Sequence, residues 1–324
     1  MSRYIVEREI LDGYLVGISN RADEYLLDRL LPGVPGPAKG VILTDGDDIE
    51  QYGGDPDSSP ERLPGDDISI GETRPPEGIP YTCQLWDRAY PVPVEDERRS
   101  QLPIPLLQRQ QRKAVHYVKT WQERAFYSIL NNTDWVYKPG APAAGDRWTA
   151  ATGDPIAQIS TAVKALDIST GLTMILDDDA AEALARNAIV RQNLRVDSDR
   201  LHIGLDRYLE AYGRARGIER IEILSAKYNT SKDPDNRSLS RIASGGWCWI
   251  GVLDGSTAAV PVDRDLFINP TAIARIREAG TGWDTIMEYE WRKKSTMVGA
   301  GVSEAITAVD TNLGALLTGL APAT

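Results

Sequence analysis

A long stretch near the N-terminus, from Thr44 to Pro80, contains almost nothing that could build a hydrophobic core. It is rich in Asp, Gly, Pro and Ser. Its apolar residues stand alone, at Ile49, Leu63, Ile68, Ile70 and Ile79. Such a segment cannot bury enough apolar surface to offset the entropy lost on ordering it. The segment must therefore be disordered, or it must be ordered against a surface that it does not itself supply.

The residues that follow favour the second possibility, because they alternate as a strand does. In "YTCQLW" (81–86) the pattern predicts Tyr81, Cys83 and Leu85 on one face and Thr82, Gln84 and Trp86 on the other. With "ISIGE" (68–72), this stretch predicts the two arms of a long β-hairpin. A two-stranded hairpin is marginally stable alone. We therefore expect it to lie on another surface.

The longest helical pattern in the chain comes next, opening at Pro103 and running to about Asn132. Proline suits the first helical turn. One stripe then recurs at spacings of four and three: Leu107, Gln111, Ala114, Val118, Trp121, Ala125 and Ser128. The pattern predicts a strut about 40 Å long at 1.5 Å per residue. We expect Val118, Trp121 and Ala125 to form its buried core, under a strand that carries Tyr289 and Trp291.

After Trp148 the pattern becomes that of a compact α/β unit. Asp154 should cap the helix of "DPIAQISTAVKAL", with Pro155 in its first turn. "LTMIL" predicts a short buried strand, and Asp177 or Asp178 should cap the helix after it. A further helix ends at Gly217, before the strands "IERIEILS" and "GGWCWIGVL". The alternation in "IMEYEWR" predicts a half-exposed strand near the C-terminus.

No catalytic motif is present, since the chain lacks a dinucleotide-binding glycine motif, a phosphate-binding loop and a nucleophile elbow. His116 and His202 are far apart in sequence. Cys83 and Cys248 make no metal or disulfide framework. We therefore expect no catalytic residue, metal or cofactor. The acidic cluster from Asp45 to Glu50 is best interpreted as a solvated loop, and a cytosolic metal-binding protein or enzyme that uses it is the alternative.

Charge and hydropathy exclude further classes. The net charge of −11 argues against a protein that reads nucleic-acid sequence, since such proteins neutralise phosphates. The N-terminus, "MSRYIVEREI", lacks the apolar run of a signal peptide. No apolar run is long enough for a membrane-spanning helix, so we expect no membrane association.

The order of these elements resembles that of a tailed-bacteriophage major capsid protein with the Hong Kong 97-type fold. The likeness rests on the N-terminal arm, the acidic hairpin returning through "YTCQLWDRAYPVPVEDERR", the long helix and the "DPIAQISTAVKAL" unit. It implies an α+β fold. The implied divisions are an N-terminal arm and start of the peripheral domain (1–44), an extended loop (45–92), a peripheral domain with a spine helix (93–151), an axial domain (152–275), peripheral strands (276–305) and a C-terminal return to the axial domain (306–324).

The resemblance also implies a function. The chain would assemble into hexamers and pentamers that form an icosahedral head, enclosing double-stranded DNA without reading its sequence. It would be made in the host cytoplasm and reside in the virion, with possible scaffold, portal and cement or decoration proteins as partners. Encapsulin and gene-transfer-agent shell proteins share the fold and remain alternatives.

In this family the extended loop lies across the neighbouring subunit. The resemblance therefore assigns inter-subunit contacts on the loop to Asp45, Asp47, Asp48, Glu50, Asp66, Asp67, Tyr81 and Trp86. The complementary basic patch at the start of the spine would be Arg98, Arg99, Arg109 and Arg112. Opposite patches on one repeating unit can guide copies into register. The alternative is that both are solvated faces.

One departure from the family bears on how the shell is held together. Some members lock their shell with an isopeptide bond between a lysine of the extended loop and an asparagine of a neighbour. Between Gly40 and Arg112 this sequence contains no lysine. We therefore expect contacts at this loop to be non-covalent, made by packing, by ion pairs or through a cement protein.

Overall fold

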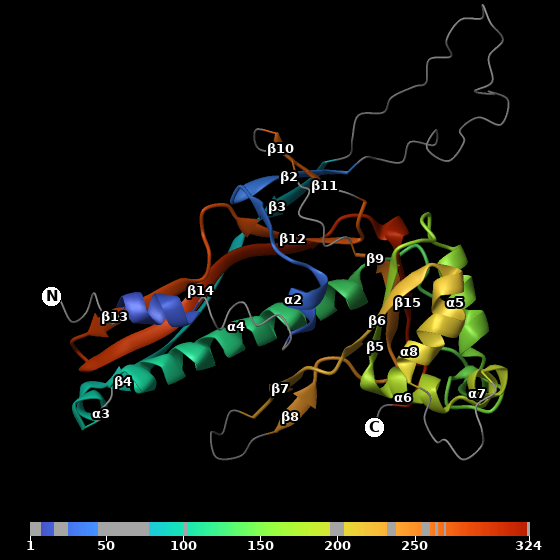
Figure 1. Ribbon diagram of the computed structural model, residues 1–324, viewed down its shortest axis with the longest axis horizontal. Helices are drawn as coiled ribbons and strands as arrows, with labels where there is room; N and C mark the ends of the chain where they lie inside the picture. The colour runs from blue at the N-terminus through green and yellow to red at the C-terminus, as the bar shows by residue number, and fades with distance from the viewer. Residues whose placement is uncertain are drawn as a thin grey trace, which may run out of the picture.

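The structure is a computed structural model that describes residues 8–15, 25–44, 78–99, 103–194, 204–231, 238–253, 260–262, 265–268 and 270–322. The fold is α+β, with three sheets, a two-stranded ribbon and one long helix (Figure 1). The "ISIGE" arm, His202 and all six acidic residues predicted to make loop contacts lie outside the described residues.

The largest sheet, called the long sheet below, is built around β14 (Ser295–Ala308). Strands β12 (Ile273–Glu278), β13 (Asp284–Glu290) and β4 (Gln84–Pro93) pair with it antiparallel, and β1 (Val34–Gly36) adds parallel to β12. The register with β4 runs from Gln84 opposite Glu304 to Pro93 opposite Ser295. The expected strand that carries Tyr289 is β13, but Tyr289 is exposed and Trp291 lies in the turn after it.

The predicted long helix is confirmed as α4 (Pro103–Asn132), which follows the short α3 (Val94–Arg99) and lies lengthwise along the long sheet (Figure 1). The prediction for its buried stripe is partly wrong. Val118 is buried, but Ala125 is half-buried and Trp121 is 41% exposed. The buried residues instead form two rows that step by four: Leu107, Gln111, Val115, Lys119 and Glu123, and Ala114, Val118, Gln122, Phe126 and Leu130. A step of four overshoots one turn by about 40°, so the stripe winds around the helix.

A second sheet, the arm sheet, is ordered β10–β11–β2–β3. Its strands are β10 (Val260–Val262), β11 (Asp265–Ile268), β2 (Lys39–Thr44) and β3 (Gly78–Thr82). Strand β3 pairs with β2. The other predicted hairpin arm, "ISIGE", lies outside the described residues, so its pairing with the return arm stays a prediction. The strand also breaks at Cys83, and the residues after it join the long sheet as β4.

The extended loop predicted over 45–92 includes residues 84–92, which pair with β14 within their own subunit. The boundaries predicted at 275 and 305 fall inside β12 and β14, which pair with each other in the long sheet. The division into axial and peripheral domains stays a prediction.

The third sheet, the helix-flanked sheet, is ordered β15–β9–β5–β6 and lies beyond one end of α4 (Figure 1). Its strands are β15 (Gly314–Leu317), β9 (Cys248–Val252), β5 (Leu172–Asp177) and β6 (Ile218–Leu224). Its helices are α5 (Pro155–Lys164), α6 (Asp178–Arg186), α7 (Ala188–Asn193) and α8 (Leu205–Tyr208). The caps are confirmed: Asp154 accepts from the Ala157 N–H, and Asp177 accepts from the Ala180 N–H.

Shorter elements complete the subunit. They are α2 (Leu26–Leu30), the ribbon of β7 (Lys227–Asn229) and β8 (Leu239–Arg241), a π turn (Leu209–Gly213) and 3₁₀ turns at Ala144–Asp146, Arg214–Arg216 and Thr311–Leu313. Residues 8–15 are also helical, and Leu11 and Leu15 pack against α4 and the long sheet. No helix in the described ranges is long and apolar enough to cross a membrane.

Candidate assembly site

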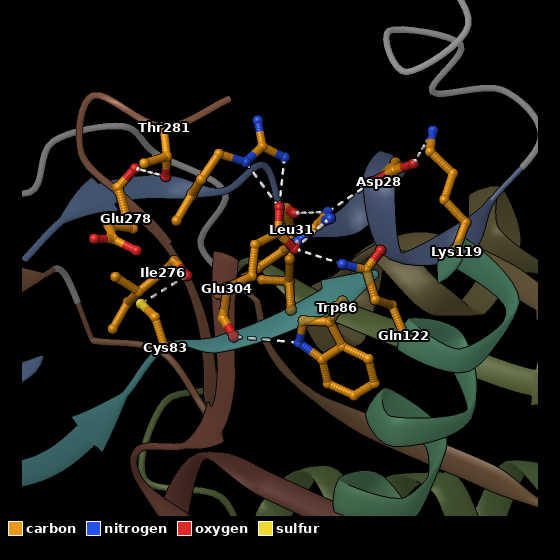
Figure 2. A network of polar contacts seen from close by, with 12 residues as sticks. Asp28, Leu31, Cys83, Trp86, Lys119, Gln122, Ile276, Glu278, Thr281 and Glu304 are labelled. Atoms are coloured by element: carbon orange, nitrogen blue, oxygen red, sulfur yellow. Dashed lines mark hydrogen bonds and ion pairs between the residues drawn. The ribbon is translucent and has the colours of Figure 1, made fainter. Parts of the chain in front are cut away.

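A buried ionic cluster joins the N-terminal segment, the long helix and the long sheet. Its centre is Glu304 on β14, whose carboxylate is 0% exposed. Two guanidinium groups from β12 reach it, from Arg275 at 2.8 Å and Arg277 at 2.7 Å. Gln122 of α4 donates from Nε2 at 2.9 Å (Figure 2). The strand position that faces α4 is thus occupied by a fully satisfied charge.

Asp28 extends this cluster to α2. Its carboxylate lies 2.7 Å from Arg275 Nη1 and 2.7 Å from Lys119 Nζ on α4 (Figure 2). Burial opposes the negative charge of Asp28, but Arg275 and Lys119 outweigh it and hold its pKa below the usual value. Removing one member of such a pair would leave a buried charge without a partner. We call Asp28, Lys119, Arg275, Arg277 and Glu304 the junction cluster.

Glu123 lies one helical turn after Lys119 and contacts the start of α2. Its carboxylate is buried and accepts a hydrogen bond from the Leu26 N–H. Burial raises the pKa of Glu123 to about 7, because bonds from the Leu26 and Leu27 N–H groups do not fully compensate for lost hydration. The contact between α2 and α4 therefore contains a carboxyl group that titrates near neutral pH.

The aromatic residues predicted to contact a neighbour are used within their own subunit. Tyr81 is 6% exposed and packs in a cluster with Ile42 and Ile276. Its ring is therefore covered by its own subunit, and its contact with a neighbour stays a prediction. Trp86 is half-buried and donates from Nε1 to the Glu304 carbonyl oxygen at 3.3 Å (Figure 2).

The structure describes the side chains of two of the four arginines in the predicted basic patch. Arg109 and Arg112 are exposed on α4, and Arg112 Nε donates to His116 Nε2 at 3.4 Å. Arg98 and Arg99 belong to α3, and their side chains are outside the description. Two arginines of the patch are thus available on one helix face.

Sequence reasoning missed the junction cluster. A usable signal was present, because Arg275 and Glu304 interrupt the apolar runs "IARI" and "VSEAI" in otherwise buried strands. Charged residues are almost never fully buried unless they are paired. Two opposite charges in two apolar strands therefore predict that those strands are neighbours.

The cysteines behave as expected of free thiols. Both lack a disulfide partner, and burial raises the pKa of Cys83 to about 11 and that of Cys248 well above its usual value. Within the described ranges, no group of three side chains could hold a metal ion. The acidic cluster from Asp45 to Glu50 lies outside those ranges.

Comparisons with known proteins identify the fold. No protein-family model and no curated protein matches the chain. A phage-related protein from Bordetella bronchiseptica matches with a TM-score of 0.69 at 18% identity, over 96% of this chain and 97% of that one.

Two further structures match more loosely. A virus-like particle from Pyrococcus furiosus has a TM-score of 0.52 at 10% identity, over 95% of this chain and 98% of that one. The capsid of an empty GTA particle has a TM-score of 0.52 at 14% identity, over 90% and 88%. The chain thus has the Hong Kong 97-type capsid fold predicted from its element order.

Proposed function

We propose that this chain is a major capsid protein, which assembles into hexamers and pentamers that form an icosahedral head around double-stranded DNA. The observation that carries this proposal is the fold likeness along nearly the whole chain, which extends to a virus-like particle and to a capsid. The sequence supports it further, because no catalytic motif competes with a structural function. Scaffold, portal and cement proteins are partners expected of such a shell.

Native sizing of the purified protein followed by electron microscopy tests this function. A shell protein should give megadalton particles, rings or sheets at moderate salt and protein concentration. A monomer or small oligomer under all assembly conditions, with or without co-expressed neighbouring genes, would contradict it. That result would favour the cytosolic metal-binding protein or enzyme.

A gene-transfer-agent shell is the second candidate, favoured by the likeness to the GTA capsid. An encapsulin-like shell would differ from both in enclosing protein cargo. Sequencing the nuclease-protected nucleic acid inside particles separates them. One recurring genome indicates a virus, mixed fragments of host DNA indicate a gene transfer agent, and an enclosed protein in place of nucleic acid indicates an encapsulin-like shell.

We further propose that the acidic extended loop meets the basic patch of a neighbouring copy. The segment 45–67 carries −8 of the chain's net charge of −11, and Arg109 and Arg112 are exposed. Exposed ion pairs are screened beyond about 8–10 Å at physiological salt.

Changing Arg109 and Arg112 together to Glu should therefore weaken assembly more at low salt than at high salt and leave the monomer folded. Light scattering during assembly measures this effect, with circular dichroism as the check of folding. Equal assembly of mutant and wild type at every ionic strength would mean that the two patches do not meet.

A further inference from the structure

A continuous series of cations and aromatic rings runs along the side of α4 and joins it to β4 and β7. We call it the cation–ring ladder; its members, in spatial order, are Lys113, Tyr90, Arg88, Tyr117, Trp121, Arg124 and Tyr228. Trp121, which the sequence pattern placed in the core, belongs to this series. The exposed ring of Trp121 is therefore in contact with Arg124 and Tyr117.

The first half of the ladder connects α4 to β4. Lys113 Nζ lies 4.3 Å from the centre of the Tyr90 ring. Arg88 Cζ lies 5.5 Å from that same ring and 4.8 Å from the centre of the Tyr117 ring. One guanidinium group is thus held between two rings that come from different elements.

The second half connects α4 to the ribbon. The rings of Tyr117 and Trp121 have centres 6.2 Å apart. Arg124 Cζ lies 4.1 Å from the Trp121 ring and 4.3 Å from the Tyr228 ring of β7. A guanidinium group sandwiched in this way has few rotamers open to it, so its position is largely fixed before any partner arrives.

The cations of the ladder keep their full charge. Across the described ranges, Arg88, Lys113 and Arg124 make no ion pair, whereas Lys119 and Arg275 nearby are buried and paired. A ring attracts a cation without neutralising it, unlike a carboxylate. Tyr117 is 38% exposed and Trp121 41%, so the ladder presents fixed positive charges and ring surface to solvent.

The net charge of the chain does not oppose an anionic ligand at this place. Residues 45–67 carry −8 of the total of −11, which leaves −3 on all other residues together. The field near a surface is set by the charges within about 8–10 Å at physiological salt. Three cations that make no ion pair in the described ranges thus lie together on a chain that is acidic overall.

We propose that the cation–ring ladder binds the backbone of the enclosed nucleic acid without reading its sequence. This inference rests on the proposed function, since it places the ladder on the inner face of a shell. Phosphates repeat along each strand of a duplex and match a row of fixed cations, and exposed rings can pack against the sugars between the phosphates. An acidic protein segment would contact the cations but not the rings. Nucleic acid can contact both, so it is the better match to the ladder.

Binding of a short mixed-sequence duplex and of oligothymidine to the full-length protein tests the proposal. The test variant is Arg88→Gln/Lys113→Gln/Arg124→Gln. The matched control, Lys164→Gln/Arg207→Gln/Arg214→Gln, removes the same number of positive charges from the surface around the helix-flanked sheet. Fluorescence anisotropy gives the affinity for each probe as a function of salt. Electron microscopy of every variant records assembly separately.

We expect the test variant to bind the duplex at least about tenfold more weakly at low salt, and the control to match wild type within about twofold. Each lost phosphate contact should reduce the slope of log K against log salt by about 0.9. Three contacts should therefore reduce it by about 2–3. Trp121→Leu should weaken binding but leave that slope unchanged, because it removes a ring and no charge.

Other results would overturn the proposal. They are no DNA binding by wild type, equal binding by test and control variants, or binding of a peptide of residues 45–67 at the ladder with no binding of either probe. The last result would make the ladder a protein contact. If the triple variant misfolds, each single variant should still reduce the slope by about 0.9. Normal shells without DNA binding would refute this inference alone, whereas the absence of shells would refute the proposed function.

Discussion

Trp121 and Phe126 show how one helix can carry two aromatic residues with opposite roles. Phe126 is 0% exposed and continues the buried stripe of α4, whereas Trp121 lies to the side of that stripe under the Arg124 guanidinium group. The predicted stripe followed the face of Trp121, whereas Phe126 lies five residues later and about 140° further round the helix. What separates them is the winding of the stripe, which depends on the sheet beneath.

These two residues should differ in their contribution to stability. Phe126→Ala should lower the free energy of unfolding of the unassembled subunit by about 3–5 kcal/mol, as is usual for a fully buried ring. Trp121→Ala should lower it by about 1–2 kcal/mol, because much of the ring is already in water and an exposed cation–π contact is weak. Denaturant unfolding measures both. Equal losses would mean that Trp121 is buried in solution.

The buried carboxyl group of Glu123 predicts a pH dependence. Its pKa is about 7 in the folded subunit against an ordinary value of 4.5, so the folded state holds its proton more tightly. Stability should therefore fall as the pH rises from about 4.5 to about 7, by about 3 kcal/mol from this group, and change little above that range.

The variant Glu123→Gln isolates this effect, because it cannot ionise. It should gain stability relative to wild type between pH 5 and pH 8, measured by urea unfolding at several pH values. Glu288→Gln changes an exposed carboxylate on β13 and is the matched control. A difference between Glu123→Gln and wild type that does not vary with pH would show that Glu123 is hydrated.

At the scale of elements, the sequence predicted what local signals control. Three such predictions are confirmed: the start of α4 at Pro103, the Asp154 cap of α5 and the buried strand β5. The sequence did not predict which strands pair with each other. Nothing in "YTCQLW" states that Tyr81 pairs with Gly40 in β2 while Trp86 pairs with Val302 in β14, because pairing is decided by residues far away in the chain.

The pairing of β4 with β14 depends on a glycine. A Cβ atom added at Gly299 would lie 2.0 Å from the Arg88 carbonyl oxygen and 2.6 Å from the Ala89 Cα. Gly299→Ala should therefore push β4 away and destabilise the subunit by about 1–3 kcal/mol. Gly282→Ala, where a Cβ would meet nothing within 4 Å, is the matched control and should stay within about 1 kcal/mol of wild type. Thermal unfolding compares the two, and equal midpoints would argue against tight pairing at Gly299.

At the scale of the whole molecule, element order alone was enough to predict the capsid fold, and the comparisons confirm it. The assembly surfaces were harder to predict from sequence. The sequence did not indicate that Tyr81 packs within its own subunit, because its partners Ile42 and Ile276 lie far from it in sequence. Residues can be assigned to an inter-subunit surface reliably only after the contacts within the subunit are known.

Shell locking can be tested on mature particles. With no lysine between Gly40 and Arg112, the extended loop cannot supply the amine of an isopeptide bond. Denaturing electrophoresis should therefore give a single band near the chain mass of 35.6 kDa. A ladder of covalent oligomers, mapped by mass spectrometry to residues 45–92, would contradict this prediction.

The central position of β14 determines when the subunit can be completed during synthesis. Strands β4, β12 and β13 all pair with residues 295–308, which follow all three of them in the chain. The ion pair of Asp28 likewise cannot form until Arg275, 247 positions later, has been made. Contacts between such distant residues form slowly, since long loops must close first. A nascent chain on the ribosome therefore cannot complete its long sheet until residues 295–308 have been made.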